Sequence, residues 1–169
     1  MTTIRPETPA DFDAIGRIHL EAFANHPFSR QTEHLIVEEL RKAGALNVSL
    51  VAVDKGEVLG HIAFSRAKIG GANCGWFMLG PVGVLPDMQR RGIGSQLVEA
   101  GLQAIRELGA AGCFLVGDPA FYGRFGFRPN PAQTVEGVPA ENSLSLALTD
   151  APIPEGEVEH HPAFMTGLS

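Results

Sequence analysis

The sequence predicts an α/β fold in which a mixed, mostly antiparallel sheet is flanked by helices on both faces. The chain has 169 residues, of which 44% are hydrophobic and 19% are charged. This length suffices for one domain with its own core, and the composition is typical of a globular chain rather than a disordered one. Strand-like and helical segments alternate in the order β-α-α-β-β-β-α-β-α-β-β. We therefore expect residues 1–169 to form a single domain.

The first part of the chain predicts a short strand and two helices. Ile4–Arg5 is strand-like, and Thr8 followed by a proline is typical of a helix start. Apolar residues then recur at helical spacing to about Ala24. A second helix ends at Gly44, because glycine commonly terminates helices.

The second part predicts a hairpin, a helix on the sheet and further strands. An Asp-Lys-Gly-Glu sequence at 54–57 lies between two strand-like segments, which is typical of a hairpin. Apolar and polar residues separate onto opposite faces of a helix from Ile93 to Leu108. A tail is expected from Val158 onward. The predicted strands of this part are residues 48–53, 58–65, 76–85, 113–116 and 143–148.

Composition also excludes several classes of protein. The net charge of −6 argues against general nucleic-acid binding, and no apolar run is long enough to span a bilayer. The N-terminus lacks the pattern of a signal peptide, so we expect a cytoplasmic protein. Cys74 and Cys113 are too few for a disulfide framework and are expected to be free thiols. His160 and His161 have no partners at metal-ligand spacing, which predicts a surface pair and no metal site.

The segment from Leu79 to Ser95 is the strongest functional signal. An apolar strand leads through Gln89, two arginines and two glycines directly into a helix. A helix N-terminus presents unpaired N–H groups and the positive end of the helix dipole, so it favours phosphate. The spacing excludes the P-loop and dinucleotide motifs, whereas a tight turn without ligand stays open as an alternative. The residues predicted to bind an anion are Gln89, Arg90, Arg91, Gly92, Ile93, Gly94 and Ser95.

Pro81 and Gly83 predict that the preceding strand separates from its neighbour. Proline cannot donate to a sheet ladder, and glycine weakens regular pairing. The N–H groups of Val82 and Val84 are then expected to face a cleft without a strand partner. An ordinary edge strand is the alternative.

These features resemble the GCN5-related N-acetyltransferases, and in particular their YhbS-type branch. The segment from Gly117 to Phe127, with Phe121-Tyr122 before a Gly-Phe pair, is similar to a second motif of that family. The resemblance implies a splayed sheet, acetyl-coenzyme A as co-substrate and an amine as acceptor. It also implies that Val82, Gly83 and Val84 bind the thioester and pantetheine arm, that Asp118 and Phe121 contact the cofactor, and that Tyr122 is the general acid.

The general base is less clear from the sequence than the cofactor site. His61, beside Gly60 on the strand before the cofactor strand, is the first candidate because imidazole titrates in the useful range. Glu21 and His26 follow, and for each a packed or solvated polar residue is the simpler interpretation. The acceptor amine is not identified. A non-catalytic acyl-coenzyme A-binding protein and an interaction module that dimerises through residues 140–164 stay open as alternatives.

Overall fold

The computed structural model describes residues 1–26 and 29–166. Its helices are α1 (Phe12–Phe23), α2 (Glu33–Lys42), α3 (Ile93–Glu107) and α4 (Pro119–Tyr122). Its strands are β1 (Thr3–Pro6), β2 (Val48–Asp54), β3 (Glu57–Ile69), β4 (Ala72–Val84), β5 (Gly112–Val116), β6 (Arg128–Pro129), β7 (Gln133–Thr134), β8 (Ser143–Ala147) and β9 (Gly156–Glu159). Within the described ranges no helix is long and apolar enough to cross a membrane.

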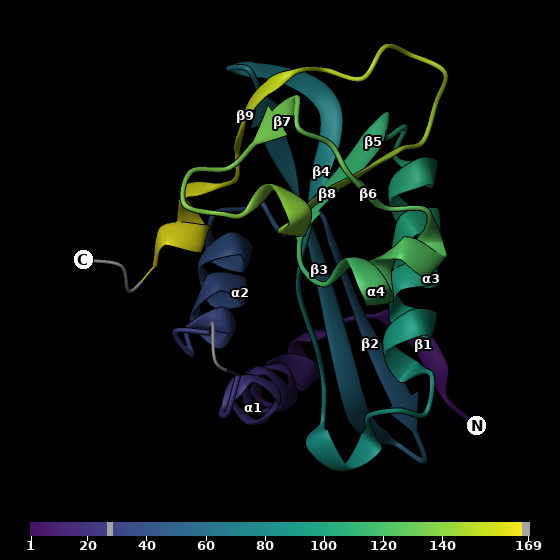
Figure 1. The fold of residues 1–169 in the computed structure, drawn as a ribbon. Helices are drawn as coiled ribbons and strands as arrows, with labels where there is room; N and C mark the ends of the chain where they lie inside the picture. Colours follow the sequence, from purple (N-terminus) through teal and green to yellow (C-terminus); the bar gives the residue numbers. More distant parts are fainter. Residues whose placement is uncertain (27–28, 167–169) are drawn as a thin grey trace.

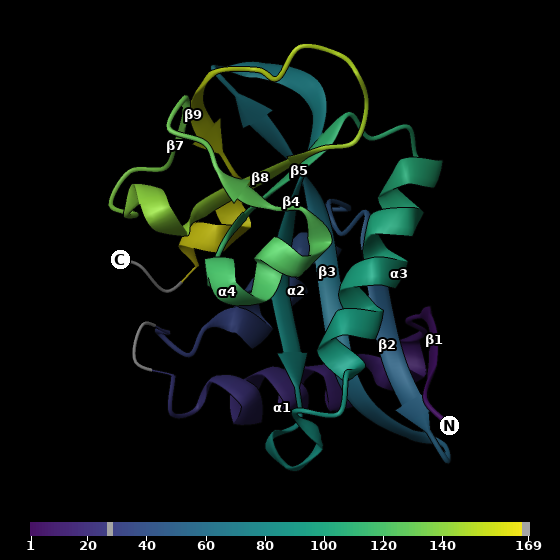
Figure 2. The ribbon, with the colours of Figure 1, turned by 45° about the vertical axis from the view of Figure 1, so that its right-hand side comes forward.

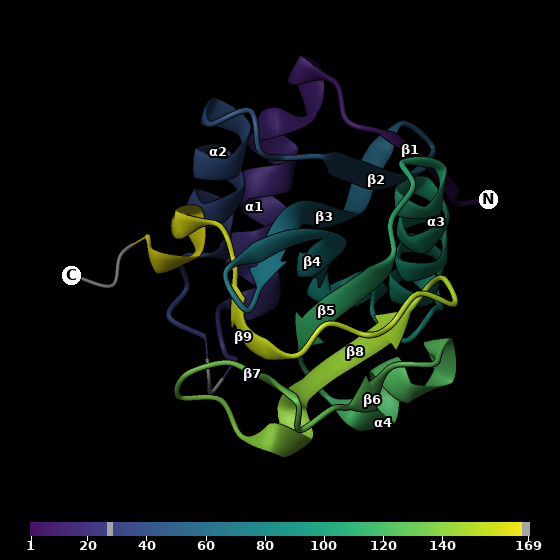
Figure 3. The same cartoon turned by 90° about the horizontal axis from the view of Figure 1, so that it is seen from above.

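The strands form one twisted sheet in the order β1-β2-β3-β4-β5-β8-β6, with β9 added beside the end of β3. Along this path β4 and β5 run parallel and the other neighbours run antiparallel. Helices α1 and α2 cover one face of the sheet and α3 covers the other (Figure 1 and Figure 3). The predicted fold class and the order of the main elements are confirmed.

The sheet splays between β4 and β5. The two strands pair only from Trp76 to Met78, whereas β4 continues to Val84 alongside β3. Figure 2 shows the lower part of β4 running past the end of β5. The pairing of β3 with β4 shifts at Gly80–Pro81, because proline has no N–H to donate. The predicted separation of this strand from its neighbour is confirmed.

Close packing of α3 on the sheet depends on one glycine. Leu97, Val98 and Ile105 of α3 are fully buried on the sheet side, and burying such a side chain stabilises the fold by roughly 1.5–3 kcal/mol. A Cβ at Gly101 would overlap the ring of Phe64 on β3. Glycine at this position therefore lets the helix approach the sheet.

The N-terminal helix begins differently from the prediction in one detail. Residues Pro9–Asp11 form a 3₁₀ turn, and α1 starts at Phe12. The Asp11 carboxylate accepts hydrogen bonds from Thr8 N–H at 2.7 Å and from the Arg5 guanidinium at 2.7 and 3.0 Å. The predicted Thr8 start is thus held by an acid three residues later, as in a capping box. The Arg5 hydrogen bonds, followed by those from Thr8, lower the pKa of Asp11 to about 2.

The tail expected from Val158 onward is wrong at its start, since residues 158–159 belong to β9. This strand pairs with both β3 and β7. Val158 is buried against Ile69 and Trp76, so a hydrophobic contact fixes a segment that is too short to show strand periodicity. Two-residue strands β6 and β7 were likewise not predicted, and β4 begins at Ala72 rather than at Trp76.

Candidate active site

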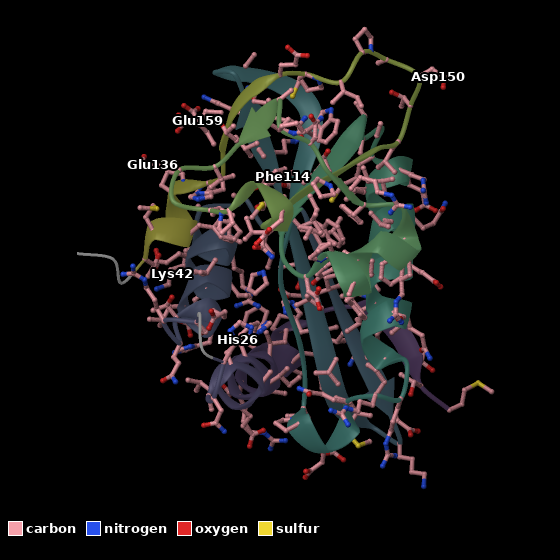
Figure 4. The ribbon with its side chains drawn as sticks, viewed as in Figure 1. His26, Lys42, Phe114, Glu136, Asp150 and Glu159 are labelled. Carbon is pink, nitrogen blue, oxygen red and sulfur yellow. The ribbon has the colours of Figure 1, made fainter. Side chains whose placement is uncertain are left out.

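A cleft of about 550 Å³ lies where β4 leaves β5. The C-terminal end of α1, the N-terminal end of α3 and the α4 turn converge on it (Figure 1). Its α1 wall is formed by Ala22, Phe23 and His26, and Figure 4 shows His26 beside the end of that helix. The remaining lining residues are Val82, Gly83, Val84, Met88, Gln89, Arg90, Gly92, Ile93, Gly94, Ser95, Phe121 and Arg124.

The floor of the cleft is the backbone of β4. A hydrogen bond from Leu85 N–H to Leu59 C=O at 2.9 Å sets the phase of the pairing with β3. In this phase Gly83 exchanges its backbone hydrogen bonds with β3, whereas Val82 and Val84 direct their N–H and C=O groups to the other side. That side is the splay. The peptide groups of Val82 and Val84 therefore face the splay, and their binding of a ligand stays a prediction.

The turn before α3 presents backbone N–H groups to the cleft. Arg90 and Gly92 have positive φ angles of 65° and 81°, which bend the chain into the start of the helix. The Gln89 side chain donates to Val84 C=O at 3.1 Å and so ties the turn to β4. The first N–H groups of α3, up to Ser95, have no partner inside the helix, and the helix dipole adds positive potential there.

Arg90 and Arg124 flank this turn, and of these two only Arg90 is predicted from the sequence. Arg90 lines the cleft, whereas Arg91 is not among its lining residues. Arg124, from the 3₁₀ turn after α4, completes the positive rim, with its guanidinium carbon 4.8 Å from the Phe121 ring centroid. The sequence motif around Tyr122 contains this arginine, but its spacing alone did not indicate that it reaches the cleft.

Phe121 and Tyr122 of α4 have ring centroids 4.9 Å apart but different surroundings. Phe121 faces the turn, where a Cβ at Gly94 would lie 3.7 Å from its ring. Tyr122 is half-buried and packs over Gly117, where a Cβ would lie only 2.7 Å from the tyrosine ring. Burial, followed by the nearby Cys113 and Asp118 side chains, raises the pKa of Tyr122 to about 12. The phenol therefore stays protonated at neutral pH.

His61 is fully buried on the α1 side of the sheet, at the centre of a chain of hydrogen bonds. Its Nδ1 lies 2.8 Å from His19 Nε2, and its Nε2 lies 2.7 Å from Ser49 Oγ. Ser49 also donates to the Glu7 carboxylate, which accepts two hydrogen bonds from Arg41 at 2.8 and 3.0 Å. The sequence singled out His61 but not the other four residues, which come from α1, α2, β2 and the loop after β1.

Both buried histidines are neutral at physiological pH. Burial, with a smaller effect of His34, lowers the pKa of His19 to about 3. Burial also holds the pKa of His61 well below 6.5, with added repulsion from His19 and Arg41 that exceeds the attraction of Asp11. Desolvation disfavours the charged form of an imidazole, which explains both directions.

Other predicted residues have positions that the structure explains locally. The Asp118 carboxylate caps α4 by accepting from Ala120 N–H at 2.9 Å, and it is not among the residues lining the cleft. Glu21 lines a neighbouring hollow instead and lies 3.6 Å from Arg17.

The C-terminal histidines and the cysteines also have structural surroundings. His161 Nδ1 accepts from Ala163 N–H at 3.0 Å. Cys113 is buried in the core, which raises the pKa of its thiol, and Cys74 is half-buried. Among the residues that the structure describes, no three His, Cys, Asp or Glu side chains are grouped to hold a metal ion.

Comparison with known proteins shows which family has this architecture. Residues 3–129 match the family described as acetyltransferase (GNAT) domain. The chain belongs to the GNAT family of N-acetyltransferases. Among curated relatives, it is 37% identical over 125 residues to the "Uncharacterized N-acetyltransferase YhbS" of Escherichia coli K12, an alignment that covers 73% of this chain and 72% of the relative.

Two solved GNAT structures extend the match over nearly the whole chain. A GNAT acetyltransferase from Brucella melitensis, in complex with acetyl-CoA, has a TM-score of 0.87 and 44% identity, covering 97% of this chain and 98% of its own. The E. coli YhbS protein, in complex with CoA, has a TM-score of 0.85 and 31% identity, covering 98% and 93%. The predicted family is thus confirmed, and all the predicted site residues of this acetyltransferase lie within the matched residues 3–129.

Proposed function

We propose that this acetyltransferase moves the acetyl group of acetyl-coenzyme A directly onto a primary amine. The observation that carries the proposal is the edge of β4, where Val82 and Val84 direct their peptide groups into the cleft beside a helix start built on glycines. The acetyl-CoA and CoA complexes of the Brucella and E. coli relatives support this choice of co-substrate.

The turn and its rim would bind the pyrophosphate of coenzyme A. Backbone N–H groups between Arg90 and Ser95 would donate to phosphate oxygens, because the first N–H groups of α3 have no partner inside the helix and lie at its positive end. The Arg90 and Arg124 guanidinium groups at the rim would add charge-assisted hydrogen bonds. A role for Arg91 stays a prediction, since its side chain is not among the cleft residues.

The amides of β4 would hold the thioester, which supplies an activated acetyl group. An N–H of Val82 or Val84 would stabilise the negative charge that develops on the acetyl oxygen as the amine attacks. Direct transfer needs no protein nucleophile when both substrates are held together. The state of Cys113 supports this mechanism, because its thiol is fully buried and its pKa is raised by that burial.

Tyr122 would protonate the departing thiolate. It lies on α4, next to Phe121 of the cleft wall, and its raised pKa keeps the proton available on the phenol. Coenzyme A thiolate is a fair leaving group, so the help required is modest. This role depends on a single atom, the phenolic oxygen.

The acceptor would be a small or peptidyl primary amine. Such an amine has a pKa near 10.4, and removing its proton at pH 7 costs roughly 4–5 kcal/mol, so the site needs a route for that proton. His61 is proposed to influence this step, although it is fully buried and reaches the α1 wall only through His19. A net charge of −6 favours a cationic acceptor.

A panel of amines tests the proposed function. The protein would be mixed with acetyl-coenzyme A and small amines, peptides with a free N-terminus or lysine-containing peptides, and the released thiol would be followed with a thiol reagent. Amine-dependent thiol release supports the proposal. Binding of acetyl-coenzyme A without transfer to any amine would instead favour a non-catalytic sensor, and absence of binding would favour an interaction module such as a homodimer through residues 140–164.

A further inference from the structure

A chain of five polar side chains crosses the layer between the sheet and the α1–α2 pair. It begins at Arg41 and Glu7, whose side chains are 20% and 15% exposed. It ends at His61 and His19, which are buried. At its inner end, His19 Nδ1 is buried and has no hydrogen-bond partner among the described residues. Buried polar atoms are normally paired, so this nitrogen requires an explanation.

The protons along this chain can be placed by elimination. The Glu7 carboxylate accepts from two Arg41 nitrogens, so it is ionised and can only accept from Ser49. The hydroxyl of Ser49 has one hydrogen, which Glu7 takes, and its oxygen must then accept from His61 Nε2–H. His61 Nδ1 is therefore an acceptor, and His19 Nε2 must donate to it.

The same elimination leaves a lone pair on His19 Nδ1. A neutral imidazole has one N–H, and in His19 that hydrogen is on Nε2. The ion pair between Arg41 and Glu7 thus fixes the tautomer of His19 through the hydrogen bonds of Ser49 and His61. In the resting protein, the inner end of the chain is therefore a hydrogen-bond acceptor.

This lone pair lies directly behind the cleft wall. A Cβ at Gly83 would be 3.0 Å from His19 Nδ1 and 3.4 Å from Ala22 Cβ, so glycine at 83 makes room for the ring. Both Gly83 and Ala22 line the cleft, and the His19 ring stacks on Phe23, which lines it as well. The backbone next to Nδ1 belongs to the segment of β4 whose amides are proposed to bind the thioester.

We propose that His19 Nδ1 accepts the proton of the attacking amine through water, and that His61 and Ser49 relay a proton to Glu7. The proposal rests on the proposed transfer of acetyl to an amine. When the amine nitrogen bonds to the acetyl carbon, its N–H bond breaks and Nδ1 takes the proton. His19 Nε2 then gives its proton to His61 Nδ1, His61 Nε2 gives one to Ser49, and Ser49 gives one to Glu7.

The relay ends at a side chain that meets solvent. Glu7 is 15% exposed and can release the proton to water. The transfer leaves the hydrogen of each imidazole on Nδ1, so these hydrogens must return to Nε2 by exchange with solvent before the next turnover. The groups that face the two histidines are His34, Arg41 and Asp11. Their combined effect, with burial, keeps both imidazoles neutral, so the acceptor atom is present at every physiological pH.

Two substitutions of His19 test the roles of its two ring nitrogens separately. The amide of His19→Gln reaches about as far as Nε2 and can still donate to His61, but it has no acceptor atom at the Nδ1 position. The amide of His19→Asn reaches about as far as Nδ1 and breaks the contact with His61. If the relay operates, both variants lose turnover by about 100-fold, within the usual range for general base catalysis, with unchanged acetyl-coenzyme A affinity. Full turnover in either variant would overturn the relay.

Ser49 provides a matched pair further along the chain. Ser49→Ala removes the hydroxyl between His61 and Glu7 and should lower kcat, whereas Ser49→Thr keeps the hydroxyl and should restore it. The pH dependence separates chemistry from structure. In His19→Gln, kcat should continue to rise above the pKa of the amine, because hydroxide replaces the relay, while the unaltered protein levels off. Parallel profiles would reject the relay.

Nitrogen NMR of the unaltered protein distinguishes a failed relay from a failed transfer. With ¹⁵N-histidine, His19 should show a protonated Nε2 and an unprotonated Nδ1 at neutral pH. A proton on Nδ1 overturns the relay whatever the activity. Absence of amine acetylation by the unaltered protein overturns the proposed function, and acetylation together with a fully active His19→Gln overturns the relay alone.

Discussion

The α3 wall of the cleft is made of backbone, whereas the α1 wall is made of side chains. On the α3 side, amides between Gln89 and Ser95 converge because two positive φ angles bend one short stretch of chain. Behind the α1 wall, the polar groups of His19 and His61 are held by contacts with β2, with α2 and with the loop that carries Glu7. A backbone wall depends on the absence of side chains, and a side-chain wall depends on its supporting contacts.

The two walls therefore differ in how they fail. An added side chain blocks the α3 wall without disturbing the fold, because the turn lies at the surface of the cleft. A removed side chain damages the α1 wall, because each group there is buried and supports the next. The following predictions test this difference, from the largest expected effect to the smallest.

Gly94→Val should abolish measurable binding of acetyl-coenzyme A while the protein stays folded. A Cβ at this position meets Phe121 only at 3.7 Å, so the added side chain fits in the free protein but fills the space proposed for phosphate. Isothermal titration calorimetry measures the affinity, and a thermal melt measures stability. Gly16→Val on α1 is the matched control, since no atom lies within 4 Å of its Cβ position. Unchanged binding in Gly94→Val would place the phosphate site elsewhere.

Tyr122→Phe should lower turnover by roughly 10- to 1000-fold, near the usual range for general acid catalysis, and leave acetyl-coenzyme A affinity unchanged. The substitution keeps the ring that packs over Gly117 and removes only the phenolic donor. Steady-state kinetics at saturating amine gives the effect on kcat. If turnover holds, Tyr122 is a packing residue between the two walls and water protonates the thiolate.

Acid should destabilise the protein through the α1 wall. Below pH 6.5 an unfolded histidine binds a proton that the buried His19, with a pKa of about 3, does not, so stability falls as pH decreases. At pH 5 the loss from His19 is about 2 kcal/mol. Urea unfolding between pH 7 and 5 measures the loss, and His19→Gln should make the profile shallower. The buried His61, whose pKa is also held well below 6.5, keeps part of the slope. A profile as steep in the variant would exclude His19 as the source, while Asp11, with a pKa of about 2, acts only below about pH 4.

The difference between the walls also explains what could be predicted from the sequence. The turn at Gln89–Ser95 and the splay at Pro81 depend on glycine and proline within one contiguous stretch, so their pattern is visible in the sequence. The polar chain combines residues between Glu7 and His61 from four elements and one loop, and no spacing connects them. His19 had one visible signal, a histidine on the apolar face of a predicted helix between Ile18 and Ala22. Arg124 could not be placed because the turn that aims it was not predicted.

The pairing of β9 and the packing of the turn after it have a consequence for folding during synthesis. Val158 covers Ile69, and Ala163 covers Ile36 and Leu40. Each of these contacts joins residues separated by more than half the chain, and the covering segment follows the stretch that matches the family. Contacts between residues so far apart in the chain form late in folding, so the apolar side chains that they cover are exposed until then. A chain emerging from the ribosome thus completes every residue of its cleft before the apolar side of α2 acquires its cover.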